Sequence, residues 1–412
     1  MKFVCKLLAG VWLFVVLSSA QAAKPQQNLP LALPLKRAAA LNQAPLPVRF
    51  PAEFEKQSAL VLGGGELGQF FPELFVEIAQ ATFGQVPLVV LVSNEDERQL
   101  LTTAMITGGF PPEAVYFASV THDTMWSRDY GPVVVERPNG SRVLVDADYF
   151  EGERKADDQV PKLLGKMSGM AVFHIPARIE GGNLLSNGQG VCLTTTTLVD
   201  RNTDRGIGQG NLKRLLHNFY GVRQTLFLEP LWGESTGHVD MFCTFTSPQT
   251  VLVGQYDVQT DLQNAQILDR NAQKLAQLRT PLGQLRVIRL PMPPNQDGVW
   301  RSYANSILIN GTALVPVYPS VCPDLDQKAL AIYKQELPGW NVVGIDATQL
   351  IERGGALHCI SLNLGQSGKL METIAQHERR RQLHPELLHP LPIAPPPAEP
   401  LTLDLAPSSP TD

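Results

Sequence analysis

Residues 160–183 read VPKLLGKMSGMAVFHIPARIEGGN, and this stretch contains the unit from which the fold can be predicted. An amphipathic helix over Val160–Met167 precedes a short apolar strand over Ala171–Ile175, and a polar loop rich in glycine follows. The same order of elements occurs five times along the chain. The other four helix–strand pairs are Pro72–Phe83 with Leu88–Val92, Leu212–Tyr220 with Thr225–Leu228, Ile267–Leu278 with Leu285–Leu290, and Gln327–Leu337 with Val342–Ile345.

A second set of short strands interleaves with these pairs. Its members are Ala59–Leu62, Val143–Val145, Val191–Thr194, Thr250–Val253 and Thr312–Val315. Apolar residues occupy both the odd and the even positions of each strand, so both faces are apolar. This is typical of strands that are covered on both faces of the sheet. One such unit cannot bury a core alone, whereas five units stacked around an axis share one. The pattern therefore predicts a single α/β domain, a five-bladed α/β propeller of strand–helix–strand repeats.

The composition of the 412-residue chain excludes two classes of protein. Hydrophobic residues make up 44% of it, and 34 Lys and Arg residues against 39 Asp and Glu residues give a formal net charge of −5. The hydrophobic fraction is sufficient for a large core, so the chain as a whole is not disordered. An acidic chain lacks the positive field that binds phosphate backbones, so we expect no nucleic acid partner.

The first residues have the pattern of a secretory signal peptide. Lys2 and Lys6 form a basic start, Leu7–Leu17 is apolar, and Ala20–Ala22 has the small-x-small form of a cleavage site. The apolar run is short for a membrane-spanning helix. We expect residues 1–22 to be a cleaved signal, so that the mature chain has no membrane anchor and is periplasmic or secreted.

The remaining chain divides into three parts. Residues 23–47 are rich in Pro, Gln and Ala and predict an extended leader, residues 48–368 form the folded domain, and residues 369–412 form a helix and a Pro-rich tail. After loss of the signal, four cysteines remain. Cys192 and Cys243 fall in apolar strands. Two interpretations stay open for them: they are free thiols in the core, or they form a disulfide bridge with each other.

The loops after the five units carry polar residues that a propeller would bring to one end of its axis. These loops are WSRDYGP at 126–132, EGGN at 180–183, TGHVD at 236–240, SYANS at 302–306 and GGALHC at 354–359. The converging side chains are Asp129, Glu180, His238, Asp240, Asn305 and Cys359. Three carboxylates around a thiol and an imidazole select a compact cation, and a planar guanidinium pairs bidentately with carboxylates. Trp126 is placed to stack on such a substrate.

These loops resemble those of the bacterial-type peptidyl-arginine deiminase and agmatine deiminase family, and Pro51–Glu55 resembles its opening motif. The resemblance spans roughly Val48 to Asn363 and implies the pentein fold, a five-bladed α/β propeller. The roles it implies are as follows: Cys359 is the nucleophile, His238 the general acid and base, Asp129 and Asp240 bind the guanidinium, and Glu180 and Asn305 complete the substrate shell. It also implies that neither a metal nor an organic cofactor is needed.

The reaction that the resemblance implies is the hydrolysis of a guanidinium to a ureido group and ammonia. The Cys359 thiolate attacks the guanidinium carbon, His238 protonates the departing ammonia, and water hydrolyses the covalent thiouronium. Because a free thiol has a pKa of about 8.5, a cation must activate Cys359. Either protonated His238 or the bound substrate supplies that cation.

The loop after Asp148 and Tyr149 bears on the substrate. Peptide-acting members that resemble this chain use arginines there to hold a substrate carboxylate, and Arg154 matches one of them, whereas Gly152 replaces another. We therefore expect a protein or peptidyl-arginine deiminase. The alternative is an agmatine deiminase that forms N-carbamoylputrescine for putrescine biosynthesis, because the acidic Glu151 and Glu153 favour an amine.

Other interpretations of the same residues stay open at this point. An arginine-binding protein without turnover would need the carboxylates but not the thiol, and an amidinotransferase shares the fold and the thiol but excludes water. A zinc site built from His238, Asp240, His358 and Cys359 lacks the ligand spacing of structural zinc sites. Asn305 is also typical of a turn, and His358 is expected to support the site rather than to bind a ligand.

Overall fold

The computed structural model describes residues 46–149 and 152–365, together with 372, 373 and 376. The predicted signal peptide, nearly all of the predicted leader (23–47) and most of the predicted C-terminal segment (369–412) lie outside the described residues. Within the described part, no helix combines the length and the apolar character that crossing a membrane requires.

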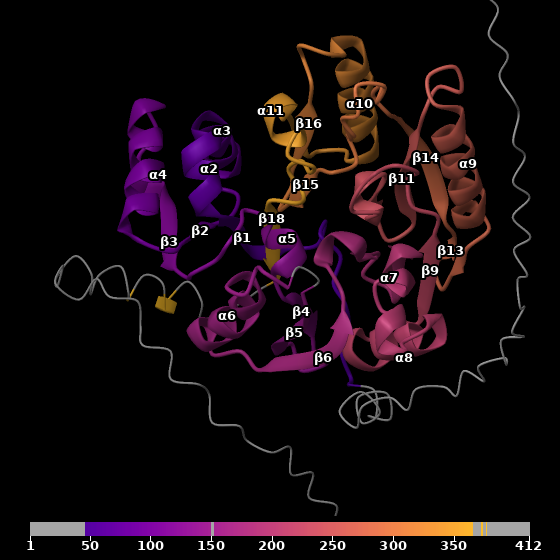
Figure 1. Cartoon of the computed structure of the whole chain (residues 1–412), viewed down its shortest axis with the longest axis horizontal. Helices are drawn as coiled ribbons and strands as arrows, with labels where there is room; N and C mark the ends of the chain where they lie inside the picture. The colour runs from indigo at the N-terminus through magenta and orange to yellow at the C-terminus, as the bar shows by residue number, and fades with distance from the viewer. Residues whose placement is uncertain (1–45, 150–151, 366–371, 374–375, 377–412) are drawn as a thin grey trace, which may run out of the picture.

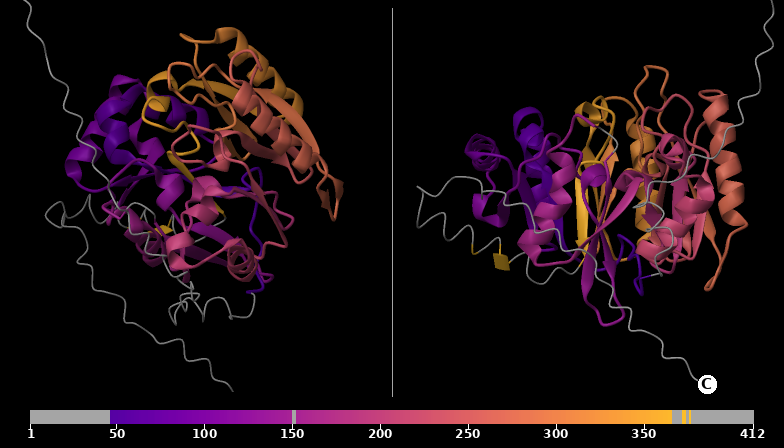
Figure 2. Two further views of the ribbon diagram at one scale, coloured as in Figure 1. Left: turned by 45° about the vertical axis from the view of Figure 1, so that its right-hand side comes forward. Right: turned by 60° about the horizontal axis from the view of Figure 1, so that its bottom comes forward.

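In the described part of the chain, five sheets of three or four strands are arranged in a ring, and the longer helices lie on the outside of it, whereas the short helix α5 lies near its centre (Figures 1 and 2). The first sheet has the order β18 (Ser361–Gly365), β1 (Gln57–Gly63), β2 (Leu88–Val92) and β3 (Val115–Ser119). The second has β4 (Val133–Glu136), β5 (Arg142–Asp148) and β6 (Val172–Arg178), and the third has β7 (Leu185–Ser186), β8 (Val191–Thr195) and β9 (Gln224–Leu228). The fourth has β10 (Cys243–Ser247), β11 (Thr250–Gln255) and β14 (Arg286–Pro291), and the fifth has β15 (Ile307–Ile309), β16 (Thr312–Val317) and β17 (Asn341–Asp346).

Helices connect the parallel strands of each sheet. The first sheet has α2 (Gly64–Phe70), α3 (Pro72–Thr82) and α4 (Glu95–Thr107). The second, third, fourth and fifth sheets have, in that order, α6 (Val160–Ser168), α8 (Gln209–Tyr220), α9 (Leu262–Ala276) and α10 (Pro323–Glu336). Short helices α5 (Ser127–Tyr130), α7 (Thr197–Asp200) and α11 (Thr348–Ile351) and the small hairpin of β12 (Arg279–Thr280) and β13 (Gly283–Gln284) complete these elements. This is the predicted five-bladed α/β propeller, the pentein fold.

Each later blade has the same internal pairing. In the second, β4 pairs antiparallel with β5 (Val133 with Val145), and β5 pairs parallel with β6 (Leu144 with Val172). The innermost strands β4, β7, β10 and β15 were not predicted. They follow the polar loops directly. β7 and β15 have only two and three residues, too few for a strand pattern to be recognised, whereas β4 and β10, with four and five residues, are as long as strands that were predicted and were missed.

The last strand of the described residues closes the ring on the first. β18 pairs antiparallel with β1, with Leu60 opposite Asn363 and Leu62 opposite Ser361. The first blade therefore contains both ends of the folded chain. As a consequence, the segment before β1 and the loop before β18 lie next to each other.

The outer helices pack one apolar face onto their sheets. In α9, Ala265, Leu268 and Leu275 are buried at helical spacing. The side chain of Asp261 accepts a hydrogen bond from the amide of Asn264 at 3.0 Å and so caps the helix. This cap explains why the helix begins five residues before the predicted Ile267.

The glycine at position 165 sets the distance between α6 and its sheet. A Cβ atom there would lie 2.2 Å from Cγ2 of Val172, so one of the two must move. We predict that Gly165→Ala destabilises the fold by about 1–3 kcal/mol. Gly210→Ala, in the first turn of α8 with open space around it, is the control and should stabilise the fold by up to about 1 kcal/mol. Urea unfolding of both variants measures this, and equal effects would contradict the packing described.

Candidate active site

Seven of the eight predicted site residues, all except Arg154, lie in five short segments, and Trp126 directly precedes the helix that contains Asp129. Asp129 is in α5, Glu180 precedes the 3₁₀ turn η3 (Gly181–Asn183), and His238 and Asp240 flank the start of η5 (Val239–Met241). Asn305 precedes β15 and Cys359 precedes β18. Hydrogen bonds and ion pairs join Asp129, Glu180 and His238 in one group and Asp240, Asn305 and Cys359 in a second group. The two groups meet at Gly182, where a Cβ atom would lie 2.6–3.1 Å from polar atoms of Asp129, His238 and Asp240.

Cys359 is held by the carboxamide of Asn305. Nδ2 of Asn305 donates to Sγ of Cys359 at 3.2 Å. Its Oδ1 accepts from the backbone amides of Ala356, His358 and Cys359 at 3.0–3.3 Å. Asn305 is fully buried, so these contacts fix the loop that carries the thiol. Contact between Asn305 and a substrate stays a prediction.

The two ring nitrogens of His238 face different groups. Nε2 lies 2.8 Å from Oε2 of Glu180, and Nδ1 lies 3.6 Å from Oδ1 of Asp129. Glu180 also forms an ion pair with Arg201, which donates to the carbonyl of Thr236 at 2.9 Å. The contacts of Glu180 therefore orient His238, and its direct contact with a guanidinium stays a prediction.

Arg201 is a member of this cluster that the sequence analysis missed. It follows the short helix α7 and belongs to none of the five polar loops. Nothing in its sequence neighbourhood distinguishes it from a surface arginine.

The two aspartates leave acceptor capacity at the centre of the site. Oδ1 of Asp129 accepts from the amide of Gly182 at 3.0 Å, and Oδ2 of Asp240 lies 2.7 Å from Nδ1 of His358. Oδ1 of Asp240 is buried and has no hydrogen-bond partner among the described residues. A buried carboxylate oxygen without a partner is unfavourable, by about 1–3 kcal/mol or more. A cationic ligand that donates hydrogen bonds would remove this penalty.

The charges around Cys359 disfavour its thiolate. Burial raises the pKa of the Cys359 thiol well above its usual range, and Asp240 and Asp129 raise it further. Burial also raises the pKa of Asp129. Sγ of Cys359 lies 3.7 Å from Oδ2 of Asp240. In this state the thiol is therefore protonated at neutral pH, and a cation placed between the aspartates would favour the thiolate.

Two glycines allow the close approach of these groups. A Cβ atom on Gly182 would lie 2.6 Å from Oδ1 of Asp129 and 2.7 Å from Nδ1 of His238. A Cβ atom on Gly355 would lie 2.7 Å from Cζ3 of Trp126 and 2.9 Å from Cβ of Cys359. The indole of Trp126 thus borders the loop of the thiol, and its stacking on a substrate stays a prediction.

Arg154 lies near the site through an intermediate tyrosine. Its guanidinium donates to the hydroxyl of Tyr149 at 3.1 Å. Burial raises the pKa of that phenol, and the nearby Asp129 carboxylate raises it further. Residues 150 and 151 of this loop lie outside the described residues, and the expected contact of Arg154 with a substrate carboxylate stays a prediction.

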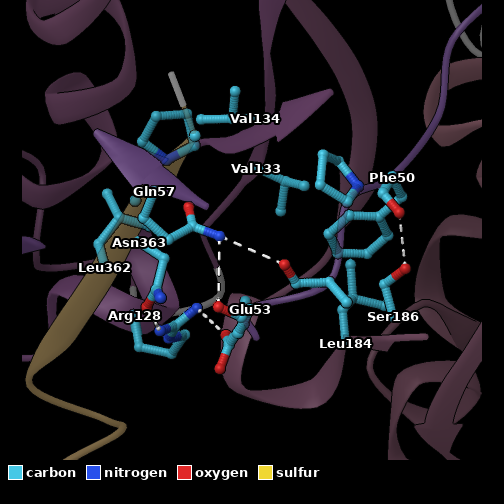
Figure 3. A pocket seen from close by; sticks show the side chains of 16 residues that line it. Phe50, Glu53, Gln57, Arg128, Val133, Val134, Leu184, Ser186, Leu362 and Asn363 are labelled. Carbon is cyan, nitrogen blue, oxygen red and sulfur yellow. Dashed lines mark hydrogen bonds and ion pairs between the residues drawn. The ribbon is translucent and has the colours of Figure 1, made fainter. Parts of the chain in front are cut away.

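A cavity of about 50 Å³ with both apolar and polar lining lies among the segment before β1, α5, β4 and β18. Figure 3 shows Glu53, Gln57, Arg128 and Asn363 at this cavity. Glu53 pairs with Arg128 at 2.6 Å, and Arg128 donates to Oδ1 of Asn363 at 2.8 Å. The sequence analysis recognised the segment Pro51–Glu55 only as a motif and assigned no role to it.

The remaining cysteines and the metal alternative can be assessed only on the described residues. Cys192, Cys243 and Cys322 are free thiols there, so Cys192 and Cys243 form no bridge. Across the same residues, no group of three or more His, Cys, Asp or Glu side chains is arranged to hold a metal ion.

Comparison with known proteins places these features in a family. The model of the Porphyromonas-type peptidyl-arginine deiminase family matches residues 49–364. A Shewanella baltica protein named "Putative agmatine deiminase" is 25% identical over 365 residues, which cover 77% of this chain and 94% of that protein. A Legionella pneumophila protein of the same name is 26% identical over 309 residues, with coverages of 71% and 85%.

Solved structures give the same result. The structure described as the "Putative Arginine Deiminase" from Porphyromonas gingivalis has a TM-score of 0.68 and 26% identity, and the match covers 78% of this chain and 99% of that one. The agmatine deiminase of Enterococcus faecalis also has a TM-score of 0.68, at 23% identity, and the match covers 77% and 96% of the two chains. The similarity to the Enterococcus faecalis structure, at 23% identity, shows that the two chains share a fold.

The charges around Cys359 predict the pH dependence of its alkylation. With iodoacetamide, Cys359 should react slowly at about pH 7, and its rate should rise about tenfold per pH unit up to the raised thiol pKa, because only the thiolate reacts. Asp129→Asn removes a negative charge, lowers the thiol pKa and should raise the rate at about pH 8 severalfold.

Peptide mass spectrometry separates Cys359 from the other cysteines in this experiment. Asp96→Asn, on the exposed start of α4, is the matched control and should leave the rate unchanged. A rate for the native protein that is the same at about pH 7 and about pH 9 would contradict the raised pKa.

Proposed function

This chain belongs to the Porphyromonas-type peptidyl-arginine deiminase family, and from that premise we propose that its substrates are arginine residues of peptides or proteins. The family and the relatives establish the coarser statement: the chain is a guanidine deiminase, a hydrolase of the C–N bond of an amidine. One observation connects this proposal with specific residues: Oδ1 of the buried Asp240, beside the Cys359 thiol, has no hydrogen-bond partner among the described residues.

The geometry supports a binding mode for the guanidinium between Asp129 and Asp240. Both aspartates have oxygens close to Cys359 or His238, and a guanidinium presents donors along two edges. Its positive charge offsets the aspartates, which raise the pKa of the Cys359 thiol in the free protein. Binding of the substrate therefore generates the thiolate that attacks it, and the thiol stays protonated in the absence of substrate.

The reaction then proceeds through a covalent intermediate. The thiolate forms a bond to the guanidinium carbon, the bond from that carbon to one nitrogen breaks, and His238 supplies the proton with which ammonia leaves. His238 next takes a proton from water, whose oxygen bonds to the same carbon, and the C–S bond breaks to release the ureido product and Cys359. Nδ1 faces the substrate side during these steps, and Glu180 at Nε2 holds the ring.

Arg154 supports the choice of a peptide substrate. Its guanidinium contacts the Tyr149 hydroxyl, whose pKa the Asp129 carboxylate raises, and this supports a cation on the Asp129 side of the binding position proposed for the guanidinium. A carboxylate of a peptide that ends in arginine is the natural partner for such a cation. Agmatine is the second candidate, favoured by the names of the curated relatives and by the exposed acid Glu153 in the same loop.

We also propose that the protein is exported and that its substrate is met outside the cytoplasm, on the basis of the signal-like pattern in residues 1–22. Amino-terminal sequencing of the protein from the periplasm or the medium tests this. A mature chain that begins at Ala23 supports export, and an intact Met1 in the cytoplasm refutes it.

Ammonia release from four substrates separates the candidate functions. The native protein should act on a peptide that ends in arginine, and Cys359→Ala should abolish turnover of every substrate in the panel. The other substrates are a peptide with internal arginine, free arginine and agmatine. Turnover of agmatine alone would favour the second candidate, and no turnover of any guanidine would contradict the deiminase function.

Arg154→Gln tests the substrate assignment within the same panel. Loss of the carboxylate partner should lower kcat/KM for the peptide that ends in arginine about tenfold and leave agmatine unaffected. Arg214→Gln, on the exposed face of α8, is the matched control and should change neither. Equal loss on both substrates would refute the role of Arg154.

A further inference from the structure

Three segments that are distant in sequence meet directly behind Asp240. Glu53 comes from the segment before β1, Arg128 from α5 and His358 from the loop before β18. Nδ1 of His358 lies 2.7 Å from Oδ2 of Asp240, and its Nε2 lies 2.9 Å and 3.0 Å from the two oxygens of Glu53. The reaction proposed above uses neither Glu53 nor His358.

The contacts of His358 require a proton on both ring nitrogens. A neutral imidazole has one N–H and one lone pair, so it would turn a lone pair toward one of the two carboxylates. Both neighbours of the ring are acceptors, because Oδ2 of Asp240 and the oxygens of Glu53 lie at hydrogen-bond distance. The imidazolium satisfies both contacts. His358 and Asp240 are 2% and 1% exposed, so water does not replace either contact.

The groups that face His358 have charges that keep it protonated. They are Glu53 and Asp240 as anions and Arg128 as a cation. Burial and Arg128 lower the pKa of His358, but Glu53 and Asp240 outweigh them and raise it above its usual value. Burial raises the pKa of Glu53, but Arg128 and His358 reverse this and lower it to about 2. The four groups form an array of two anions and two cations, in which Arg128, His358 and Asp240 are buried and Glu53 is partly exposed.

The array determines how Asp240 can meet a substrate. Because the imidazolium binds Oδ2, the carboxylate cannot rotate freely, and Oδ1 is the oxygen left without a partner. His358 also precedes Cys359 directly, so one loop positions both the thiol and the acceptor beside it. Loss of the imidazolium charge would weaken the hold on Asp240, since charge-assisted hydrogen bonds are about twice as strong as neutral ones.

We propose that Glu53 keeps His358 protonated and that the His358 imidazolium holds the carboxylate of Asp240 oriented to receive the guanidinium. Both are positioning residues, because they act through Asp240 and do not touch the reacting atoms. The inference rests on the proposed function for its kinetic consequence, but not for the charge of His358. It assigns a role to the opening motif Pro51–Glu55.

The kinetic test compares Glu53→Gln, His358→Asn and the control Glu55→Gln over a pH range. Asn retains a neutral donor at the position of Nδ1, so His358→Asn should lose about tenfold in kcat/KM to the same extent at every pH. In Glu53→Gln, Arg128 is no longer balanced, and the pKa of His358 falls. The loss of kcat/KM in Glu53→Gln should therefore be small at about pH 6 and should approach the loss in His358→Asn at about pH 8.

The control lies in the same motif but outside the array. Glu55 forms an ion pair with Arg49 at 2.7 Å and accepts from the amide of Ala52 at 2.9 Å. Glu55→Gln should leave the pH profile unchanged. A loss in Glu53→Gln that is the same at every pH would indicate a purely structural role and would overturn the proposal.

A second measurement does not depend on turnover or on the identity of the substrate. In protein labelled with ¹⁵N-histidine, the ring signals of His358, assigned by their absence in His358→Asn, should show two protonated nitrogens at about pH 7.5. In Glu53→Gln they should show a single one. A neutral ring in the native protein would overturn the inference even if deimination is confirmed. If no guanidine is turned over but the imidazolium is found, the proposed function fails and the charge assignment stands.

Discussion

The carboxylate of Asp240 is the group on which the arrangement of this site depends. It is buried, one oxygen is bound by His358, and the other has no partner among the described residues. Cys359, Asp129 and His238 lie around it, and burial together with the two aspartates keeps the thiol protonated in the free protein. A single compact cation resolves both conditions, since it supplies donors to the free oxygen and compensates the charge that disfavours the thiolate. Recognition of the substrate and activation of the nucleophile therefore have one electrostatic cause.

The propeller makes this concentration of charge tolerable because the charged groups come from several blades, with only His238 and Asp240 in one segment, and each is supported from behind. Glu180 and Arg201 support His238, Asn305 supports the loop of the thiol, and His358 with Glu53 supports Asp240. Closure of the ring by β1 and β18 brings the segment that contains Glu53 next to the loop that contains His358. The pairing of the first and last strands therefore contributes to the chemistry as well as to the fold.

The sequence predicted the features that repeat and those that stand out by residue type. The five helix–strand units follow from hydrophobic periodicity, and Asp129, His238, Asp240 and Cys359 stand in polar, glycine-rich loops that interrupt it. Of the innermost strands, β7 and β15 could not be predicted, because they have only two and three residues. Arg201 and Glu53 were missed as site residues for another reason. Their roles depend on contacts across blades, and no local pattern encodes these contacts.

The central claim, that Cys359 forms a covalent bond to a guanidinium carbon held by Asp129 and Asp240, is tested most directly by trapping the intermediate. The native protein would be mixed with a substrate that it turns over and quenched with acid within the first turnovers, and its peptides would be analysed by mass spectrometry. The account predicts an adduct on the peptide that contains Cys359, with the mass of the substrate less ammonia, and none in Cys359→Ala. Turnover without such an adduct under conditions that slow its hydrolysis, or an adduct on another residue, would contradict the account.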